Sequence, residues 1–509
     1  MLKGIRNSII LTSLLYIVLG VVLIVFPEVS LGLACILIGA VTLIYGVVRI
    51  VAFVRDGGEA SGRFDLFVGV LLAALGIFLL TYALMLTLQK YRPIIALSSA
   101  AVFVVLGLLG VYDLSPLGAL AAVDYNVLLM IAGTMGLVTL FIDSRMPAYL
   151  AEQLIVRVPN VKWAVTVLAL FAGVISAFVD NVATVLMVAP VGLAISRKLK
   201  ISPVPVLIAI AVSSNLQGAA TMVGDTTSML LGSYAGMNFL DFFWMQGRPG
   251  IFWGVELGAL ASLVALLVIF RKYTEKVAAA VETQVSDYVP SALMIGTVAL
   301  LIVASFLPEP SDPTLKAIYD LRSGLVCVGL CLIGIVRDCV RKHSGGTFLR
   351  VLKDLDKDTL LLLFGLFMVI EGIRVAGVID AAADLFYNIS GDDPFLLYTL
   401  IVFASVVLSA FIDNIPYVAT MLPVVEGIAA LMNGGAGLPP YVFYFGLLTG
   451  ATLGGNLTPI GASANIAAIG ILRKNGETVR LRDFLRIGVP FTLSAVLAGY
   501  IYIWLVWGI

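Results

Sequence analysis

The chain is poor in charged residues, with only 12% of its 509 residues charged against 61% hydrophobic. A soluble domain has about 25% charged residues, so the mean hydropathy of +1.09 excludes an ordinary globular protein. Lysine and arginine balance aspartate and glutamate, so the net charge gives no indication of a nucleic-acid partner. Four cysteines are too few for a disulfide framework. The single histidine, His343, lies in a charged loop and excludes histidine chemistry in the apolar core.

The apolar segments predict an all-α polytopic membrane protein. Helices cross a bilayer with stretches of ~20 apolar residues, and the chain contains about a dozen candidates. Lysine and arginine concentrate in the loops on one side, which the positive-inside rule makes cytoplasmic. This places the C-terminus at Ile509 outside. We expect an integral protein of a bacterial or archaeal plasma membrane, with the lipid bilayer around it.

One sequence pattern occurs twice. Residues 176–190 read SAFVDNVATVLMVAP and residues 409–423 read SAFIDNIPYVATMLP. Each copy has an Asp-Asn pair inside an apolar stretch: Asp180-Asn181 and Asp413-Asn414. A carboxylate at membrane depth costs about 2.5–3.5 kcal/mol on insertion scales. Two of them in matched positions indicate a functional site.

The repeated pattern predicts two re-entrant helical hairpins, at 162–196 and 394–431, each turning at its Asp-Asn pair. Two long helices that carry Asp-Asn by chance are the alternative. Polar and glycine-rich residues also interrupt the runs 203–235 and 439–472, which predicts two discontinuous helices. Small-residue helix packing is the alternative there. An odd number of crossings separates the hairpins, so the repeat is expected to be inverted.

The chain is therefore divided into four predicted parts. An appended transmembrane module occupies 1–77, and the first transporter repeat occupies 78–250. Connecting helices follow at 251–320, and the second repeat occupies 321–509. The discontinuous helices share a loose pattern, in which Asn215 matches Asn456 and Gly224 matches Gly461.

From about residue 78 to the end, the chain resembles the ion transporter superfamily. That group includes divalent-anion/sodium symporters, citrate carriers, arsenite-efflux pumps, NhaD-type sodium/proton antiporters and the P protein. The resemblance is carried by the Asp-Asn tips, by GDTTSML at 224–230 and by GGNLTPIGASAN at 454–465. The symporters have Ser-Asn-Thr at each tip, whereas only the Asn of that triplet is present here. The first ~80 residues, with VLGVVLIVFPEVSLGL, resemble small HdeD-like membrane proteins.

The resemblance implies a homodimer with two cation or proton sites, each made of one hairpin tip and one unwound helix, with substrate between them. The Na⁺ candidates are Asp180, Asn181, Asp413 and Asn414, and the carboxylates of the two aspartates could also accept H⁺. Asp225 is a third candidate carboxylate, with capping of the following half-helix as its alternative role. Further ligand candidates with neutral oxygens are Thr184, Asn215, Thr226, Asn456, Thr458, Ser463 and Asn465. No cofactor is expected besides Na⁺ or H⁺.

The leading functional prediction is an ion-coupled secondary transporter that exchanges Na⁺ or another small ion for H⁺. The alternative is Na⁺- or H⁺-coupled symport of a di- or tricarboxylate, with arsenite efflux and a passive channel as further alternatives. Two acidic tips favour cation handling, because ionised aspartates repel an entering carboxylate. An enzyme is not expected, since Asp225 lacks an evident partner in a catalytic constellation.

Overall fold

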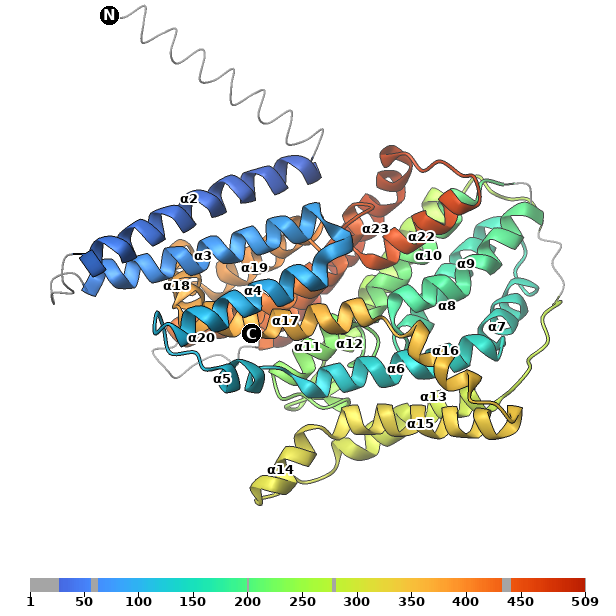
Figure 1. Ribbon diagram of the computed structural model, residues 1–509. Helices are drawn as coiled ribbons and strands as arrows, with labels where there is room; N and C mark the ends of the chain where they lie inside the picture. Colours follow the sequence, from blue (N-terminus) through green and yellow to red (C-terminus); the bar gives the residue numbers. More distant parts are fainter. Residues whose placement is uncertain (1–26, 56–62, 199–200, 277–280, 433–440, 509) are drawn as a thin grey trace, which may run out of the picture. The chain divides into compact units, whose positions relative to one another are not determined.

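The computed structural model describes residues 27–55, 63–198, 201–276, 281–432 and 441–508. Their secondary-structure elements are helices (Figure 1). The exception is a small antiparallel pair of strands, β1 (Trp244–Met245) and β2 (Arg248–Pro249). Eight helices in the described ranges are long and apolar enough to cross a membrane. The predicted class, an all-α polytopic membrane protein, is confirmed.

Contacts between residues divide the chain into two compact units. The first contains residues 1–123 with 361–381, and the second contains 124–360 with 382–509. These limits differ from the predicted ends of the repeats, because compactness follows packing whereas repeats follow the order of equivalent elements. The repeat boundaries stay a prediction.

The first unit is built from helices that pack through small residues. Its elements are α2 (Pro27–Arg55), α3 (Arg63–Thr87), η2 (Gln89–Tyr91), α4 (Arg92–Leu108), α5 (Pro116–Ala121) and α17 (Lys357–Val375) from residue 361 onward. A Cβ atom on Gly46 of α2 would lie 2.4 Å from the backbone nitrogen of Ala73 in α3. One on Gly76 of α3 would lie 2.5 Å from the nitrogen of Leu43. Glycine therefore lets these two helices approach closely, as is common between helices in membranes.

The second unit contains the remaining elements, including most of α18. They are α6 (Tyr125–Asp143), α7 (Met146–Ile155), α8 (Val161–Ser176), α9 (Asn181–Lys198), α10 (Pro203–Gly218), α11 (Thr226–Tyr234), η3 (Leu240–Phe242), α12 (Ile251–Ile269), α13 (Val289–Ser305), α14 (Pro313–Asp320), α15 (Arg322–Lys342), α16 (Gly346–Asp354), α18 (Val378–Ser390), α19 (Pro394–Ser409), α20 (Asn414–Met432), α21 (Tyr441–Leu448), the π-helical η4 (Thr449–Leu453), η5 (Gly455–Leu457), α22 (Ser463–Lys474) and α23 (Leu481–Trp507).

Four interruptions in these helices define the elements of the site. Helix pair 1 (α8 and α9) is joined by tip 1, residues 177–180, and helix pair 2 (α19 and α20) by tip 2, residues 410–413. Broken helix 1 (α10 and α11) is interrupted at 219–225. Broken helix 2 runs from α21 through η4 and η5 to α22, with its main interruption at 458–462. That each helix pair enters and leaves the membrane on one side stays a prediction.

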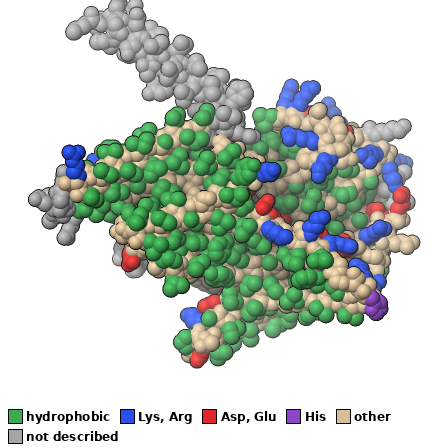
Figure 2. Space-filling model, in the orientation of Figure 1, with side chains coloured by type: hydrophobic (Ala, Val, Ile, Leu, Met, Phe, Trp, Pro, Cys, Tyr) green, Lys and Arg blue, Asp and Glu red, His purple; other side chains and the backbone are tan. Residues whose placement is uncertain are grey.

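The surface separates apolar and basic regions. Figure 2 shows hydrophobic side chains over most of the visible face, while lysine and arginine gather where α9, α15, α16 and α22 end. Such an arrangement is expected of a protein with lipid around its apolar belt and basic residues at one membrane surface. The assignment of that surface to the cytoplasm stays a prediction.

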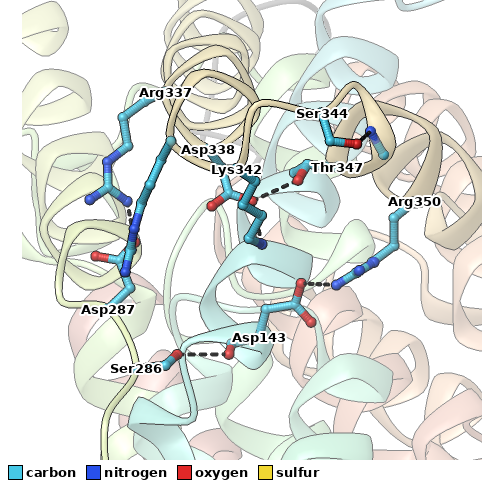
Figure 3. A network of polar contacts seen from close by, with 11 residues as sticks. Asp143, Ser286, Asp287, Arg337, Asp338, Lys342, Ser344, Thr347 and Arg350 are labelled. Carbon is cyan, nitrogen blue, oxygen red and sulfur yellow. Dashed lines mark hydrogen bonds and ion pairs between the residues drawn. The ribbon is translucent and has the colours of Figure 1, made fainter.

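A network of ion pairs ties the basic end of the second unit together (Figure 3). Asp287, between α12 and α13, contacts Arg337 and lies 2.8 Å from Arg341, both on α15. Asp143 at the end of α6 pairs with Arg350 of α16 at 2.6 Å. Burial alone would raise the pKa of Asp287, but the hydrogen bond from Arg337 and the two positive charges bring that pKa below its usual value.

Candidate functional site

Broken helix 1 contacts tip 1 at Gly224, where there is no room for a side chain. A Cβ atom on Gly224 would lie 2.5 Å from the carbonyl oxygen of Gly218 and 2.6 and 2.7 Å from those of Ser176 and Ala177. Thr221 in the same interruption donates a short hydrogen bond to the carbonyl of Ala177. The interrupted backbone of the helix therefore lies directly against the tip.

Broken helix 2 contacts tip 2 in the same way. A Cβ atom on Gly461 would lie 2.6 Å from the carbonyl oxygen of Gly455 and 2.7 and 2.9 Å from those of Ser409 and Ala410. Thr458 donates a short hydrogen bond to the carbonyl of Ala410. The match of glycines, carbonyls and threonine shows that the two tip-and-helix units are structurally equivalent.

This equivalence changes one pairing predicted from the sequence. Gly224 matches Gly461 as expected, and Thr221 then matches Thr458. With the same alignment, however, Asn215 matches Thr452 rather than Asn456, four residues further on. Thr452 lies in the π-helical turn η4, whereas Asn456 lies in η5. Pairing identical residue types in the two sequences did not identify Thr452 as the equivalent of Asn215.

At tip 1, Asp180 closes the beginning of α9. Its Oδ2 accepts hydrogen bonds of 3.0 Å from the backbone amides of Val182 and Ala183. Carboxylates are favoured at this position because the first amides of a helix lack partners and carry partial positive charge. Thr184 lies in the first turn of α9, and its hydroxyl is 3.4 Å from the carbonyl of Val179. Asp180 is therefore fixed at the tip by the backbone.

At tip 2, Asp413 has a similar place but an additional side-chain partner. The side chain is buried, its Oδ1 accepts from the amide of Ile415 at 3.2 Å, and its Oδ2 accepts from Ser463 at 3.1 Å. Ser463 begins α22, so this bond joins the tip to broken helix 2. The neighbouring Asn414 is buried, and its Nδ2 has no hydrogen-bond partner within the described ranges.

Asn465, on α22, belongs to the second tip-and-helix unit. Its Nδ2 donates to the carbonyls of Gly455 at 3.1 Å and Thr458 at 3.2 Å, bridging the interruption of its own helix. Its buried Oδ1 accepts no hydrogen bond from the described residues. An amide oxygen in this position remains available to a ligand such as a cation.

A chain of buried amides connects the two tip-and-helix units, all within the second compact unit. Asn181 donates to Oδ1 of Asn215 at 3.0 Å. Asn215 in turn donates to the carbonyl of Thr452 at 2.7 Å and to Oδ1 of Asn456 at 3.1 Å. Asn456 donates back to the carbonyl of Val212 at 2.9 Å. The two predicted ligands Asn215 and Asn456 thus lie at the centre, but here their amides link the broken helices to each other.

Asp225 lies beside this link, at the first residue before α11. It is buried, and its Oδ2 accepts a hydrogen bond of 2.7 Å from Thr227. The hydroxyl of Thr227 is also 3.0 Å from that of Thr452. The side chain of Asp225 makes no capping hydrogen bond to the helix, although it occupies the N-cap position. Thr226 follows it and is buried as well.

Tip 1 borders a cavity of about 540 Å³. The lining side chains include four acids and no base: Asp143, Asp180, Asp354 and Asp356. Asp354 and Asp356 lie at the end of α16 and in the loop before α17, and sequence reasoning missed them. In the sequence they belong to a charged segment, KDLDKD, that is indistinguishable from a solvated loop.

The buried charges of the second unit are acidic. Within the described ranges, the buried charged side chains are Asp225, Asp338 and Asp413, and lysine and arginine are absent from this set. The described residues contain no cluster of three or more His, Cys, Asp or Glu side chains that could hold a metal ion. A Na⁺ ion at either tip would therefore need amide, hydroxyl and carbonyl oxygens besides one carboxylate.

Comparison with known proteins identifies the family to which the chain is similar. A family model described as a citrate transporter matches residues 82–443, and one described as a short repeat of unknown function matches residues 11–81. An uncharacterized transporter of Mycobacterium tuberculosis (strain CDC 1551 / Oshkosh) is 30% identical over 436 residues, which cover 85% of this chain and 98% of that protein. The P protein of Homo sapiens is 26% identical over 448 residues, which cover 75% of this chain and 53% of that protein.

Two solved transporters share the fold. The YdaH transporter of Alcanivorax borkumensis has a TM-score of 0.51 at 16% identity, covering 82% of this chain and 98% of its own. MtrF of Neisseria gonorrhoeae has a TM-score of 0.50 at 14% identity, covering 82% and 94% of the two chains. At these identities the likeness concerns the fold alone.

Proposed function

The chain belongs to the citrate transporter family and is a membrane transporter, and from this premise we propose that it exchanges Na⁺ or another small cation for H⁺. In this proposal Asp180 and Asp413 are the two coupling carboxylates. The observation that carries it is the acidic centre of the second unit, where carboxylates are present without a buried lysine or arginine in the described ranges.

Electrostatics favours a cation over an anion in such a centre. Two like unit charges about 8 Å apart repel each other by about 2 kcal/mol at an effective dielectric constant of about 20. A di- or tricarboxylate beside Asp180, Asp225 and Asp413 would be repelled by each ionised carboxylate. A cation would be attracted by each of them, and a bound proton would neutralise one of them. Na⁺ and H⁺ would therefore compete for the same carboxylates.

The cavity at tip 1 also favours a cation as the transported ion. Asp143 is paired with Arg350, but the other three acids would attract cations from the solution on that side and raise their local concentration near Asp180. At tip 2, the carboxylate of Asp413, the hydroxyl of Ser463 and the free amide oxygen of Asn465 offer the oxygen ligands that Na⁺ requires.

Carboxylate symport is the second candidate, and the citrate transporter model is the observation that favours it. It becomes possible electrostatically if cations bound at Asp180 and Asp413 neutralise both tips before the anion enters. Anion and cation would then strengthen each other's binding by equal factors.

Calorimetry of Na⁺ binding in two buffers of different ionisation enthalpy separates the two functions. Exchange predicts that Na⁺ binding releases protons, tightens as the pH rises and is unaffected by citrate. Asp180→Asn and Asp413→Asn should each reduce the proton release, whereas Asp338→Asn, a buried acid of the ion-pair network in Figure 3, should retain it. Tighter Na⁺ binding with citrate and no proton release would contradict exchange and favour symport.

A further inference from the structure

Gln217, near the end of α10, is a buried amide with no use in the site described so far. Its side chain has no exposed surface, and neither Oε1 nor Nε2 has a hydrogen-bond partner in the parts of the chain that the structure describes. A buried polar group without a partner costs stability, so most such groups in proteins are paired. The present conformation therefore gives neither the oxygen nor the nitrogen of this amide a hydrogen-bonding role.

The structure makes room for this side chain on helix pair 1. It lies against Gly173 of α8, where a Cβ atom would be 2.5 Å from Cδ of Gln217 and 2.7 Å from both amide atoms. Any larger residue at position 173 would displace the amide. Gly173 and Gln217 therefore form a matched pair between α8 and α10.

The second repeat closes the equivalent place without a polar side chain. The residue of broken helix 2 that matches Gln217 is Gly454, and the residue of helix pair 2 that matches Gly173 is Val406. A Cβ atom on Gly454 would lie 2.6 Å from Cα of Val406. All the nearest atoms belong to the backbone of Val406, so here the two backbones approach closely and no amide lies between them. Packing alone does not require an amide at this place.

The hydroxyl of Ser176 is the next polar group along α8 towards tip 1. It lies three residues beyond Gly173 and so on the same side of the helix, about 4.5 Å further along its axis. In this conformation it accepts a hydrogen bond of 3.0 Å from Ser214, which is three residues before Gln217 on α10. The two helices thus present two polar positions, Ser214 and Gln217, to one hydroxyl.

We propose that Gln217 is a positioning residue of the transport cycle, whose amide pairs with Ser176 when α8 moves by about 4.5 Å along α10. Shifts of about one turn between packed helices are a known form of conformational change. Because α8 leads into tip 1, the movement would carry Asp180 relative to Asn215. The proposal rests on the proposed transport function and adds to it the element that moves.

Gln217→Met tests the role of the amide, because it keeps the length of the side chain and removes both polar atoms. The variant should unfold at the same temperature as the wild type or higher, because two unpaired buried groups are lost. Its maximal rate of Na⁺-driven H⁺ flux in proteoliposomes should fall about tenfold, with the KM for Na⁺ changing less than about threefold. Leu216→Met, at the neighbouring buried position, is the matched control and should leave both quantities unchanged.

A second variant copies the arrangement of the other repeat. Gly173→Val combined with Gln217→Gly reproduces the Val406 and Gly454 pair, so it should fold and show the same loss of rate. Ser176→Ala should also lower the rate, and adding it to Gln217→Met should cause no further loss, because both changes remove one interaction. Losses that multiply in the double variant would overturn the pairing with Ser176.

Labelling of a cysteine introduced at Val182, in a background without the native cysteines, reports movement of tip 1 without assuming a substrate. Gln217→Met should change the labelled fraction, and Leu216→Met should not. If the wild type showed no Na⁺-driven flux but this difference remained, the proposed function alone would fail. Wild-type labelling and flux in Gln217→Met would overturn the proposal. So would failure of both Gln217 variants to fold, since the amide would then be structural.

Discussion

Replacing Asn215 by leucine is expected to destabilise the second unit more than any other single change in the amide chain. Leucine has a similar shape but no polar atoms, so packing is largely retained. The change leaves three buried groups without this partner: Nδ2 of Asn181, the carbonyl oxygen of Thr452 and Oδ1 of Asn456. Asn215 is the residue whose amide connects tip 1 with broken helix 2.

The expected magnitude follows from these three groups. Leaving a buried donor or acceptor unpaired costs about 1–3 kcal/mol, so the sum is about 3–9 kcal/mol before relaxation. Total stabilities of domains are about 5–15 kcal/mol. Asn456→Leu should cost less, because Nδ2 of Asn215 keeps its bond to the carbonyl of Thr452. Asn215→Leu should therefore lower the unfolding temperature by at least twice as much as Asn456→Leu.

Thermal unfolding of the purified variants in detergent measures this order directly. Leu216→Met provides the baseline for a change of a neighbouring buried side chain. An unfolding temperature of Asn215→Leu equal to that of the wild type would refute the reasoning, because the amide link would then contribute nothing. An equal loss in Asn215→Leu and Asn456→Leu would show that Asn215 has no special place in the chain of amides.

Further predictions concern the close contact at tip 1, the ion-pair network and the topology. Gly224→Ala should reduce the yield of folded protein, because backbone oxygens at 2.5 to 2.7 Å cannot give way, whereas Gly470→Ala, with no atom within 4 Å, should be tolerated. Asp287→Asn should cost about 1 kcal/mol at neutral pH, where its carboxylate is ionised in both states. Since its pKa is lowered on folding, this loss should vanish in unfolding measurements well below pH 4. Single cysteines at Val182 and Ile415 should react with impermeant thiol reagents from opposite sides of the membrane; reaction of both from one side only would refute the inverted arrangement.

The parts of the site that were predictable from the sequence are those that belong to short motifs present in both repeats. The Asp-Asn tips stand out because a carboxylate is costly in an apolar segment, and Gly224 and Gly461 mark the interruptions of both broken helices. The structure brings Asp225, Asn215 and the other predicted side chains of the second unit together with these tips. Their roles as ligands stay a prediction.

Other parts could not be predicted, for physical reasons that differ from residue to residue. Thr452 was missed because Asn456 lies four residues beyond the place that matches Asn215, so the two asparagines do not occupy matching places. Asp354 and Asp356 resemble ordinary loop acids until the fold places them on the cavity. Gln217 has no sequence signal, because its meaning lies in Gly173 across the helix contact and in the reversed pair of the second repeat.

The central claim, that Asp180 and Asp413 couple Na⁺ to H⁺, is tested most directly by internal pH in proteoliposomes. Vesicles with a Na⁺-free lumen and an internal pH dye receive external NaCl, with KCl as the control for ionic strength. Exchange predicts that Na⁺ enters as H⁺ leaves, so the lumen becomes alkaline with NaCl only, and that Asp180→Asn and Asp413→Asn each abolish the change. A lumen that stays at constant pH in the wild type, or becomes equally alkaline in both variants, would contradict the account.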